Sequence, residues 1–248
     1  MIINTTQGNI VKDGLVFWLD AGHRASYPEA GTAWYDISGN GLTGALTNGP
    51  TYDSANKGSI VFDGGNDYVS VPNFNEDSNQ ALTVFCWFNS SDLTNKSASY
   101  FYSWLVNKRD NGGDRQWQLL TRETAPGSGI HRLRMNMWDT TTPTQNIVGA
   151  EYDAENLSEN TWYYGGFVTD GANVTMYLNG ASGGTGTLGG TGIRKTGSKE
   201  MVIATSAWSY NFLPLKGKVS SVEIYNRALS SSEVEQNFNA LKGRYGII

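Results

Sequence analysis

The sequence predicts an all-β protein, folded as an antiparallel sandwich of two sheets. Short apolar runs recur along the 248 residues, and turn-forming residues, among them 30 glycines, separate these runs. In the clearest runs apolar and polar side chains alternate, which is typical of strands with one buried face. Hydrophobic residues make up 39% of the chain and charged residues 17%, a composition that favours a folded core over disorder. We expect a single domain, because one sandwich can reach about 250 residues.

The apolar runs predict strands at Gly14–Asp20, Ser59–Phe62, Asp67–Val71, Leu82–Phe88, Tyr100–Val106, Arg115–Leu120, Leu133–Trp138, Trp162–Val168, Val174–Asn179, Met201–Ala204 and Lys218–Tyr225. Alternation is plainest where Leu133, Met135 and Met137 share one side of a strand. The run Leu82–Phe88 is apolar on both sides, which predicts a central strand covered on both faces. Cys86 lies in this run, so we expect it to be an ordinary core thiol.

One helix is expected, near the C-terminus. Ser230 and Glu233 have the spacing of a capping box, and apolar residues follow at helical spacing as far as Leu241. Gly243 is the expected stop signal. We expect this short helix to pack on the edge of the sandwich.

We expect two parts of the chain: an N-terminal arm at residues 1–13 and the sandwich domain at residues 14–248. Residues 1–13 are polar and show no helix or strand pattern, so they are interpreted as an N-terminal arm. That arm either docks onto a neighbouring subunit or is a disordered leader. Within the domain, Gly183–Gly192 is nearly all Gly and Thr, which predicts a mobile loop or a plain long hairpin connection.

Charge and cysteine content exclude several function classes. The net charge is −5 and no basic stripe occurs, which argues against binding along a nucleic-acid backbone. The single cysteine cannot form an intrachain disulfide. No apolar run approaches about 18 residues, so no membrane-spanning helix is expected. The first residues lack the basic start and apolar run of a signal peptide, and export by that route is not expected.

Several motifs occur in a characteristic order along the chain. They are Gly14–Gly22, Trp34–Gly41, Val61–Gly64 leading into Asp67–Val69, Val174–Gly180, and Gly217–Val219 followed by Val222–Ser230. On these motifs the chain from about Gly14 onward resembles the laminin-G-like branch of the concanavalin A-like lectin/glucanase superfamily. The resemblance implies an antiparallel jelly-roll sandwich that closes on a short helix.

The segment Asn237–Gly246 is similar to the C-termini of laminin-G-like proteins of phage virions, especially aquatic and cyanobacterial phages. This similarity implies a non-enzymatic virion protein, as a capsid decoration, a tail protein or a fibre-associated appendage, assembled in the host cytoplasm. Its expected partners are other virion proteins, further copies of itself in a homo-oligomer, and host-surface glycans. The alternative is a carbohydrate-binding lectin domain on a bacterial cell surface.

A less favoured alternative is a glycoside hydrolase. Glu151, Asp153 and Glu155 resemble the Glu-x-Asp-x-Glu strand motif of retaining glucanases, in which alternation places all three carboxylates on one face. However, Tyr152 stands where that motif has a small aliphatic residue. The segment also precedes Leu157–Trp162, where laminin-G-like chains have a loop before a strand. We therefore expect a solvated acidic turn and no catalytic residues.

Two sets of residues are the candidate binding sites. Laminin-G relatives often bind Ca²⁺ at one rim of the sandwich, so the resemblance implies Asp20, Asp36 and Asp67 as possible calcium ligands; otherwise they make turn and strand-end hydrogen bonds. No cofactor is required.

Trp208 and Tyr210 lie in a segment too polar and irregular for a simple core, which makes them candidate ligand-binding residues, because aromatic rings stack on sugar faces and anchor interfaces. Trp18, Trp87 and Trp162 lie within predicted strands, and we expect them in the core.

Overall fold

A computed structural model of the chain describes residues 9–76, 80–94, 102–109, 115–138, 147–188, 200–206 and 213–248. The strands are β1 (Leu15–Asp20), β2 (Ala33–Tyr35), β3 (Thr43–Thr47), β4 (Thr51–Asp53), β5 (Ser59–Asp63), β6 (Tyr68–Val71), β7 (Leu82–Ser90), β8 (Tyr102–Arg109), β9 (Arg115–Glu123), β10 (His131–Trp138), β11 (Ile147–Glu151), β12 (Trp162–Thr169), β13 (Asn173–Leu178), β14 (Ala181–Thr187), β15 (Met201–Ile203) and β16 (Lys216–Tyr225). The helices are α1 (Ser231–Leu241) and two 3-10 turns, η1 (Ala55–Lys57) and η2 (Lys242–Tyr245).

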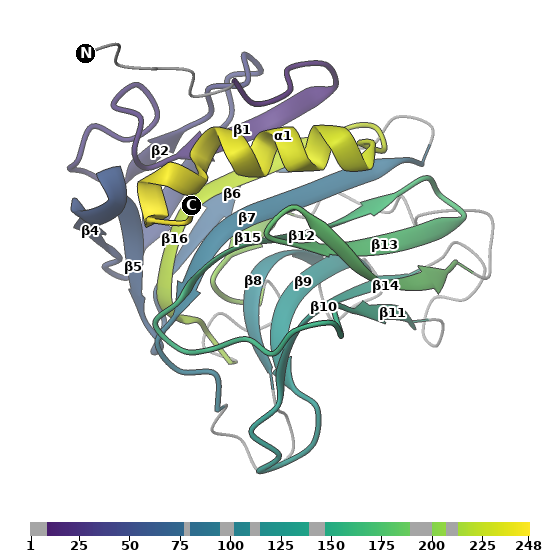
Figure 1. The fold of residues 1–248 in the computed structure, drawn as a ribbon. Coiled ribbons are helices and arrows are strands. Elements are labelled where there is room, and N and C mark those ends of the chain that lie inside the picture. The colour runs from purple at the N-terminus through teal and green to yellow at the C-terminus, as the bar shows by residue number, and fades with distance from the viewer. Residues whose placement is uncertain are drawn as a thin grey trace, which may run out of the picture.

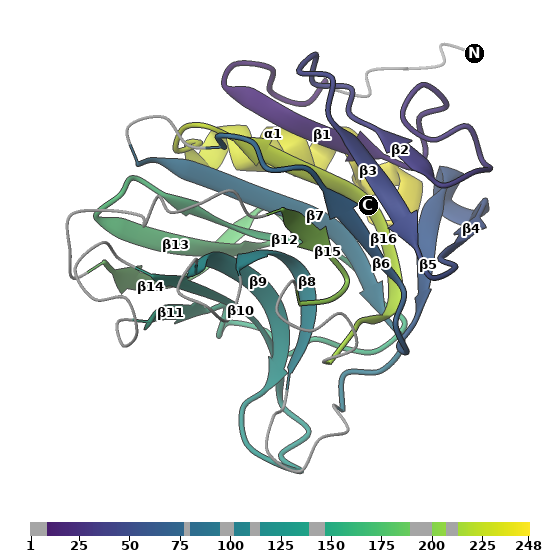
Figure 2. The same cartoon turned by 180° about the vertical axis from the view of Figure 1, so that it is seen from behind.

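The strands form two antiparallel sheets of eight strands each. The first sheet has the order β14-β13-β12-β7-β16-β5-β4, and β1 pairs with β16 beside β5 (Figure 1). The second sheet has the order β11-β10-β9-β8-β15-β6-β3-β2, and its strands lie in front in the reverse view (Figure 2). This arrangement confirms the predicted antiparallel jelly-roll sandwich.

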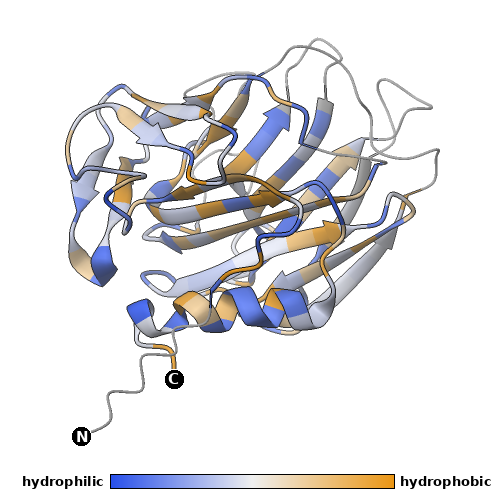
Figure 3. Ribbon diagram, turned by 90° about the horizontal axis from the view of Figure 1, so that it is seen from above, coloured by the Kyte–Doolittle hydropathy of each residue, from blue (hydrophilic) through white to orange (hydrophobic). Residues whose placement is uncertain are grey.

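The main core fills the space between the two sheets. In β10, Leu133, Met135 and Met137 are fully buried, while Arg134 and Asn136 between them stay partly exposed on the outer face. The predicted period of two is therefore confirmed in this strand. The same alternation of hydrophobic and hydrophilic residues runs along other strands in Figure 3.

A second cluster of buried residues covers the outer face of the first sheet. Along β7, Cys86 and Phe88 point into the main core, whereas Phe85 and Trp87 point to the opposite face. Helix α1 lies over that face (Figure 1). All nine residues of β7 are buried as a result, which confirms the expected two-sided central strand and the buried, unpaired Cys86.

Helix α1 begins after Ser230 and ends at Leu241, as predicted, but the predicted stop residue is wrong. Ser230 Oγ accepts a hydrogen bond from Glu233 N at 3.3 Å, and the Glu233 carboxylate accepts one from Ser230 N at 2.8 Å, so the capping box is confirmed. Gly243 is not the stop: the chain continues through η2, and the left-handed terminating residue is Gly246, with φ 72°. The expected position at the sandwich edge is also wrong, because the apolar side of the helix packs on the outer face of the first sheet.

The described end of the N-terminal segment belongs to the domain. Ile10 and Val11 are buried in the cluster under α1. Val11 N donates to Asn237 Oδ1 at 2.8 Å, and Tyr225 OH donates to Val11 O at 3.1 Å. Ile10 and Val11 therefore pack on the domain itself. Residues 1–8 lie outside the described residues, and the N-terminal arm stays a prediction.

The glycine-rich segment does not begin as a loop. Residues 181–187 form β14, which pairs with β13, so the prediction of a loop is wrong for residues 183–187, and residues 189–192 lie outside the described residues. The glycines are required by close packing: a Cβ at Gly184 would clash with the carbonyl oxygen of Glu151, where the edges of the two sheets meet. Short strands β2, β3, β4 and β11 were not predicted either. Within the described residues no helix has the length and apolar character needed to cross a membrane.

Candidate functional site

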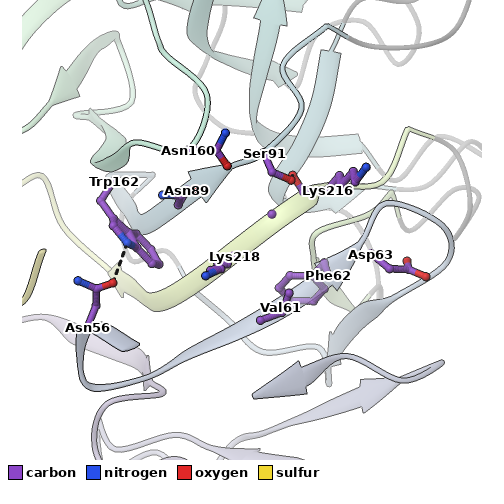
Figure 4. Close-up of a pocket in the computed structure, with 11 residues that line it drawn as sticks. Asn56, Val61, Phe62, Asp63, Asn89, Ser91, Asn160, Trp162, Lys216 and Lys218 are labelled. Atoms are coloured by element: carbon purple, nitrogen blue, oxygen red, sulfur yellow. Dashed lines mark hydrogen bonds between the residues drawn. The ribbon is translucent and has the colours of Figure 1, made fainter. Parts of the chain in front are cut away.

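A groove with a volume of about 630 Å³ opens on the outer face of the first sheet (Figure 4). It lies where β5, β16 and the end of β7 run side by side. Since Ile60 and Val219 point into the main core, the alternate residues Val61 and Lys218 point outward into the groove. The lining residues are Asn56, Val61, Phe62, Asp63, Asn89, Ser91, Asn160, Trp162, Lys216, Gly217 and Lys218.

The floor of the groove depends on Gly217. A Cβ at this position would clash with the carbonyl oxygen of Asn89, and would lie 2.9 Å from the Cα of Ser90. Only glycine therefore allows β16 to approach the end of β7 so closely. The backbone of Lys216 is fixed in the same place, because its carbonyl oxygen accepts a hydrogen bond from Ser91 N at 2.9 Å.

The indole of Trp162 forms one wall. It is partly buried and packs on Tyr245 of η2, with ring centroids 4.7 Å apart. Its Nε1 donates to Asn56 Oδ1 at 3.2 Å (Figure 4), and Asn56 Nδ2 donates in turn to Arg244 O at 2.9 Å. Helix-terminal residues thus hold this ring in one orientation, which lowers the entropy cost of using it as a contact surface.

Both signs of charge border the groove. Lys218 Nζ forms an ion pair of 2.6 Å with Asp53 Oδ2, and this hydrogen bond is the main reason that the pKa of Asp53 is lowered. The exposed Lys216 ammonium has no ion-pair partner among the described residues. Asp63 Oδ1 accepts from Gly65 N at 2.6 Å and keeps its second oxygen for other contacts.

This set of groups suits binding more than hydrolysis. An indole face offers apolar contact, and neighbouring amide, ammonium and carboxylate groups supply donors and acceptors. The volume lies in the range of about 300–1,000 Å³ that small-molecule sites occupy. Asp63 is the one carboxylate among the described lining residues, whereas glycoside hydrolysis ordinarily uses two carboxylates that flank one bond.

The suspected glucanase motif does not form a catalytic row. Strand β11 ends at Glu151, and Asp153 and Glu155 follow in non-strand backbone, exposed to solvent. Glu151 Oε1 is held by Arg134 Nη1 at 2.6 Å and Arg122 Nη1 at 3.0 Å. The three carboxylates therefore do not share one strand face. Asp153 and Glu155 are exposed outside the strand, as expected for a solvated acidic turn, whereas the expectation is wrong for Glu151, which ends β11 and pairs with two arginines.

The first candidate calcium ligand is held by protein groups. Asp20 is fully buried, and its Oδ1 accepts hydrogen bonds from Arg244 Nη1 at 2.7 Å and Gly22 N at 2.9 Å. A carboxylate that is neutralised by a guanidinium group binds a cation more weakly than a free carboxylate does.

The other two candidates make turn contacts. Asp36 Oδ1 accepts from Trp18 N at 2.9 Å and Ser38 N at 2.8 Å, which are the local hydrogen bonds given above as the alternative role. Asp67 Oδ2 accepts from Asp63 N at 3.2 Å, and burial raises the pKa of Asp67. In the described part of the chain no three His, Cys, Asp or Glu side chains gather as a metal site. Calcium binding stays a prediction.

Two aromatic candidates lie outside the described residues, namely Trp208 and Tyr210. Among the tryptophans expected in the core, Trp87 is fully buried, whereas Trp18 and Trp162 are partly buried on the outer face. Sequence reasoning therefore missed the groove. The one sequence signal for the groove was the alternation of Lys216 and Lys218 at the start of the last strand, which places both side chains on the same face.

A laminin-G family model, described as the concanavalin A-like lectin/glucanases superfamily, matches residues 63–235. The chain belongs to this superfamily. The match covers the strands that form most of both sheets and continues into α1. No curated protein sequence matches the chain.

Solved lectin-like domains share the fold of this superfamily member. The binding domain of Paraclostridial Mosquitocidal Protein 1 superimposes with a TM-score of 0.69 at 20% identity, over 92% of this chain and 52% of that one. Domain 4 of AbnA, a GH43 extracellular arabinanase from Geobacillus stearothermophilus, in complex with arabinotriose, superimposes with a TM-score of 0.64 at 17% identity, over 90% of this chain and 97% of that one. The receptor binding domain of botulinum neurotoxin D superimposes with a TM-score of 0.65 at 16% identity, over 92% of this chain and 52% of that one. The chain thus spans about half the length of the two toxin domains, and at these identities the likeness is one of fold.

Proposed function

We propose that the chain is a non-catalytic, lectin-like module that binds a saccharide in the groove beside Trp162. The observation that carries this proposal is the partly buried indole of Trp162, which is fixed by Tyr245 and Asn56 and bordered by amide and lysine side chains. A pyranose or furanose ring has an apolar C–H face that can stack on such an indole. Its hydroxyl groups then meet the polar groups around the rim.

The fold relatives support a binding role. Two of them are toxin binding domains, and the arabinanase domain was solved with a saccharide, arabinotriose. Catalysis has no comparable support in the described residues, because the groove holds a single carboxylate and Glu151 is paired with two arginines.

A glycan array tests this proposal directly. The purified chain should bind a subset of glycans, and Trp162→Ala should lower the affinity at least about tenfold, or about 1.4 kcal/mol. Trp18→Ala is the matched control, because Trp18 also lies partly buried on the outer face and does not line the groove. Equal binding by the two variants would remove the groove from the proposal. Screening with and without Ca²⁺ tests the calcium prediction in the same experiment.

The setting that we propose for this module is the surface of a phage virion, as a decoration, tail or fibre-associated protein that contacts other virion subunits or host glycans. The similarity of residues 237–246 to phage laminin-G-like proteins supports this setting. Several copies in a homo-oligomer would add avidity to weak saccharide contacts. Antibody labelling of purified particles should place the chain on their surface. Labelling of the bacterial envelope instead would favour the cell-surface lectin.

A further inference from the structure

A second recess, of about 780 Å³, lies where the edges of the two sheets meet. Arg132 and Arg134 of β10 line it together with Glu151 at the end of β11, Asp153, and Gly184 of β14. It shares no lining residue with the groove beside Trp162. We call it the Arg132 recess.

Positive charge is concentrated on the outer face of the second sheet beside this recess. Arg132 lies directly opposite Arg122 of β9, and Arg134 follows two residues later on the same face. Like charges opposite each other in a sheet are destabilising unless an anion lies between them. Glu151 is that anion for two of the three, with its Oε1 at 2.6 Å from Arg134 Nη1 and 3.0 Å from Arg122 Nη1.

Arg132 is the one of these three arginines that Glu151 does not pair with. No described residue accepts a hydrogen bond from it or forms an ion pair with it, and its Nη1 is buried without an acceptor. Buried donors in native proteins nearly always have a partner. Asp153 lines the same recess but forms no ion pair with Arg132. Three guanidinium groups therefore face two carboxylates at this corner of an otherwise acidic protein.

We propose that the Arg132 recess binds the carboxylate or sulfate group of an acidic saccharide. A planar guanidinium donates two parallel hydrogen bonds to either of these groups, and Arg122 and Arg134 add to the positive field without competing for the ligand, because Glu151 already holds them. The saccharide part of this inference rests on the proposed lectin function. The anion site itself rests on Arg132.

Titration calorimetry at low salt tests the inference with three probes of equal length: an oligogalacturonate, a sulfated oligogalactan and a neutral oligogalactan. One or both acidic probes should bind more tightly than the neutral one, and Arg132→Gln should weaken that binding about tenfold while leaving the neutral probe unchanged. Comparing the two acidic probes identifies the carboxylate or the sulfate as the recognised group. High salt should weaken the acidic interaction selectively.

The control is Arg24→Gln, which removes the same charge from an exposed residue elsewhere, where the guanidinium pairs with Glu29. Equal losses in the two arginine variants would overturn the site, since net charge alone would then explain the effect. Failure of both acidic probes to bind would overturn it as well. The neutral probe separates the two proposals. If this probe never binds and Arg132→Gln still weakens the binding of an acidic probe, the groove proposal fails and the recess proposal stands.

Discussion

Glu223 shows how a single buried residue can make the stability of this protein depend on pH. It lies fully buried on the outer side of β16, where Tyr164 OH donates to its carboxyl group at 2.7 Å and Ser221 Oγ at 3.1 Å. Burial raises its pKa to about 7, and these hydrogen bonds offset only part of that rise. The folded state therefore holds a proton that the unfolded chain, with a pKa near 4.5, releases.

The sign of the pH dependence follows from this raised pKa. The contribution of Glu223 to stability is complete below about pH 4.5 and is lost as the pH rises through about 7, with a total of about 3 kcal/mol. Urea unfolding should show a lower free energy of unfolding at pH 8 than at pH 5. Glu223→Gln should flatten this difference, while Glu235→Gln, on the exposed side of α1, should retain it. An unchanged slope in Glu223→Gln would contradict the explanation.

At the scale of one element, the start of α1 depends on its capping box. Ser230→Ala removes the acceptor for Glu233 N, and we expect a loss of about 1 kcal/mol in the free energy of unfolding. Asn239→Ala is the control, because this exposed helical residue makes no hydrogen bond with described residues, and alanine has the higher helix propensity. Denaturation curves that shift equally in both variants would show that the cap is not what stabilises the helix start.

The elements that the sequence predicted are those whose signals are local. The capping box at Ser230 and the alternation around Leu133 depend on neighbours in the chain, and both are confirmed. Strand β14 was missed because Gly183 and Gly184 suggest flexibility, whereas they allow close approach to Tyr152 and Glu151 of another sheet. Such a contact joins residues about thirty positions apart and leaves no local pattern.

At the scale of the whole molecule, the two candidate sites were unpredictable for the same reason. The groove joins Asn56, Trp162 and Lys218, which come from three distant parts of the chain, and Asn56 takes a left-handed conformation with φ 55°. The Arg132 recess needs β14 of one sheet to meet β11 of the other. By contrast, the sandwich itself follows from the number and period of the apolar runs, which need no knowledge of long-range contacts.

The C-terminal helical segment contacts a wall of the groove through Tyr245 of η2. Its ring packs between Trp87, at 4.1 Å, and the groove residue Trp162, at 4.7 Å, although Tyr245 does not line the groove. We therefore expect Tyr245→Ala to weaken saccharide binding several-fold and to lower the free energy of unfolding by about 3 kcal/mol. Tyr245→Phe keeps the ring and loses only the 2.9 Å hydrogen bond to Ser220 Oγ, so it should bind normally. If Tyr245→Ala, measured below its unfolding transition, binds as tightly as the unmodified chain, the indole does not need this support.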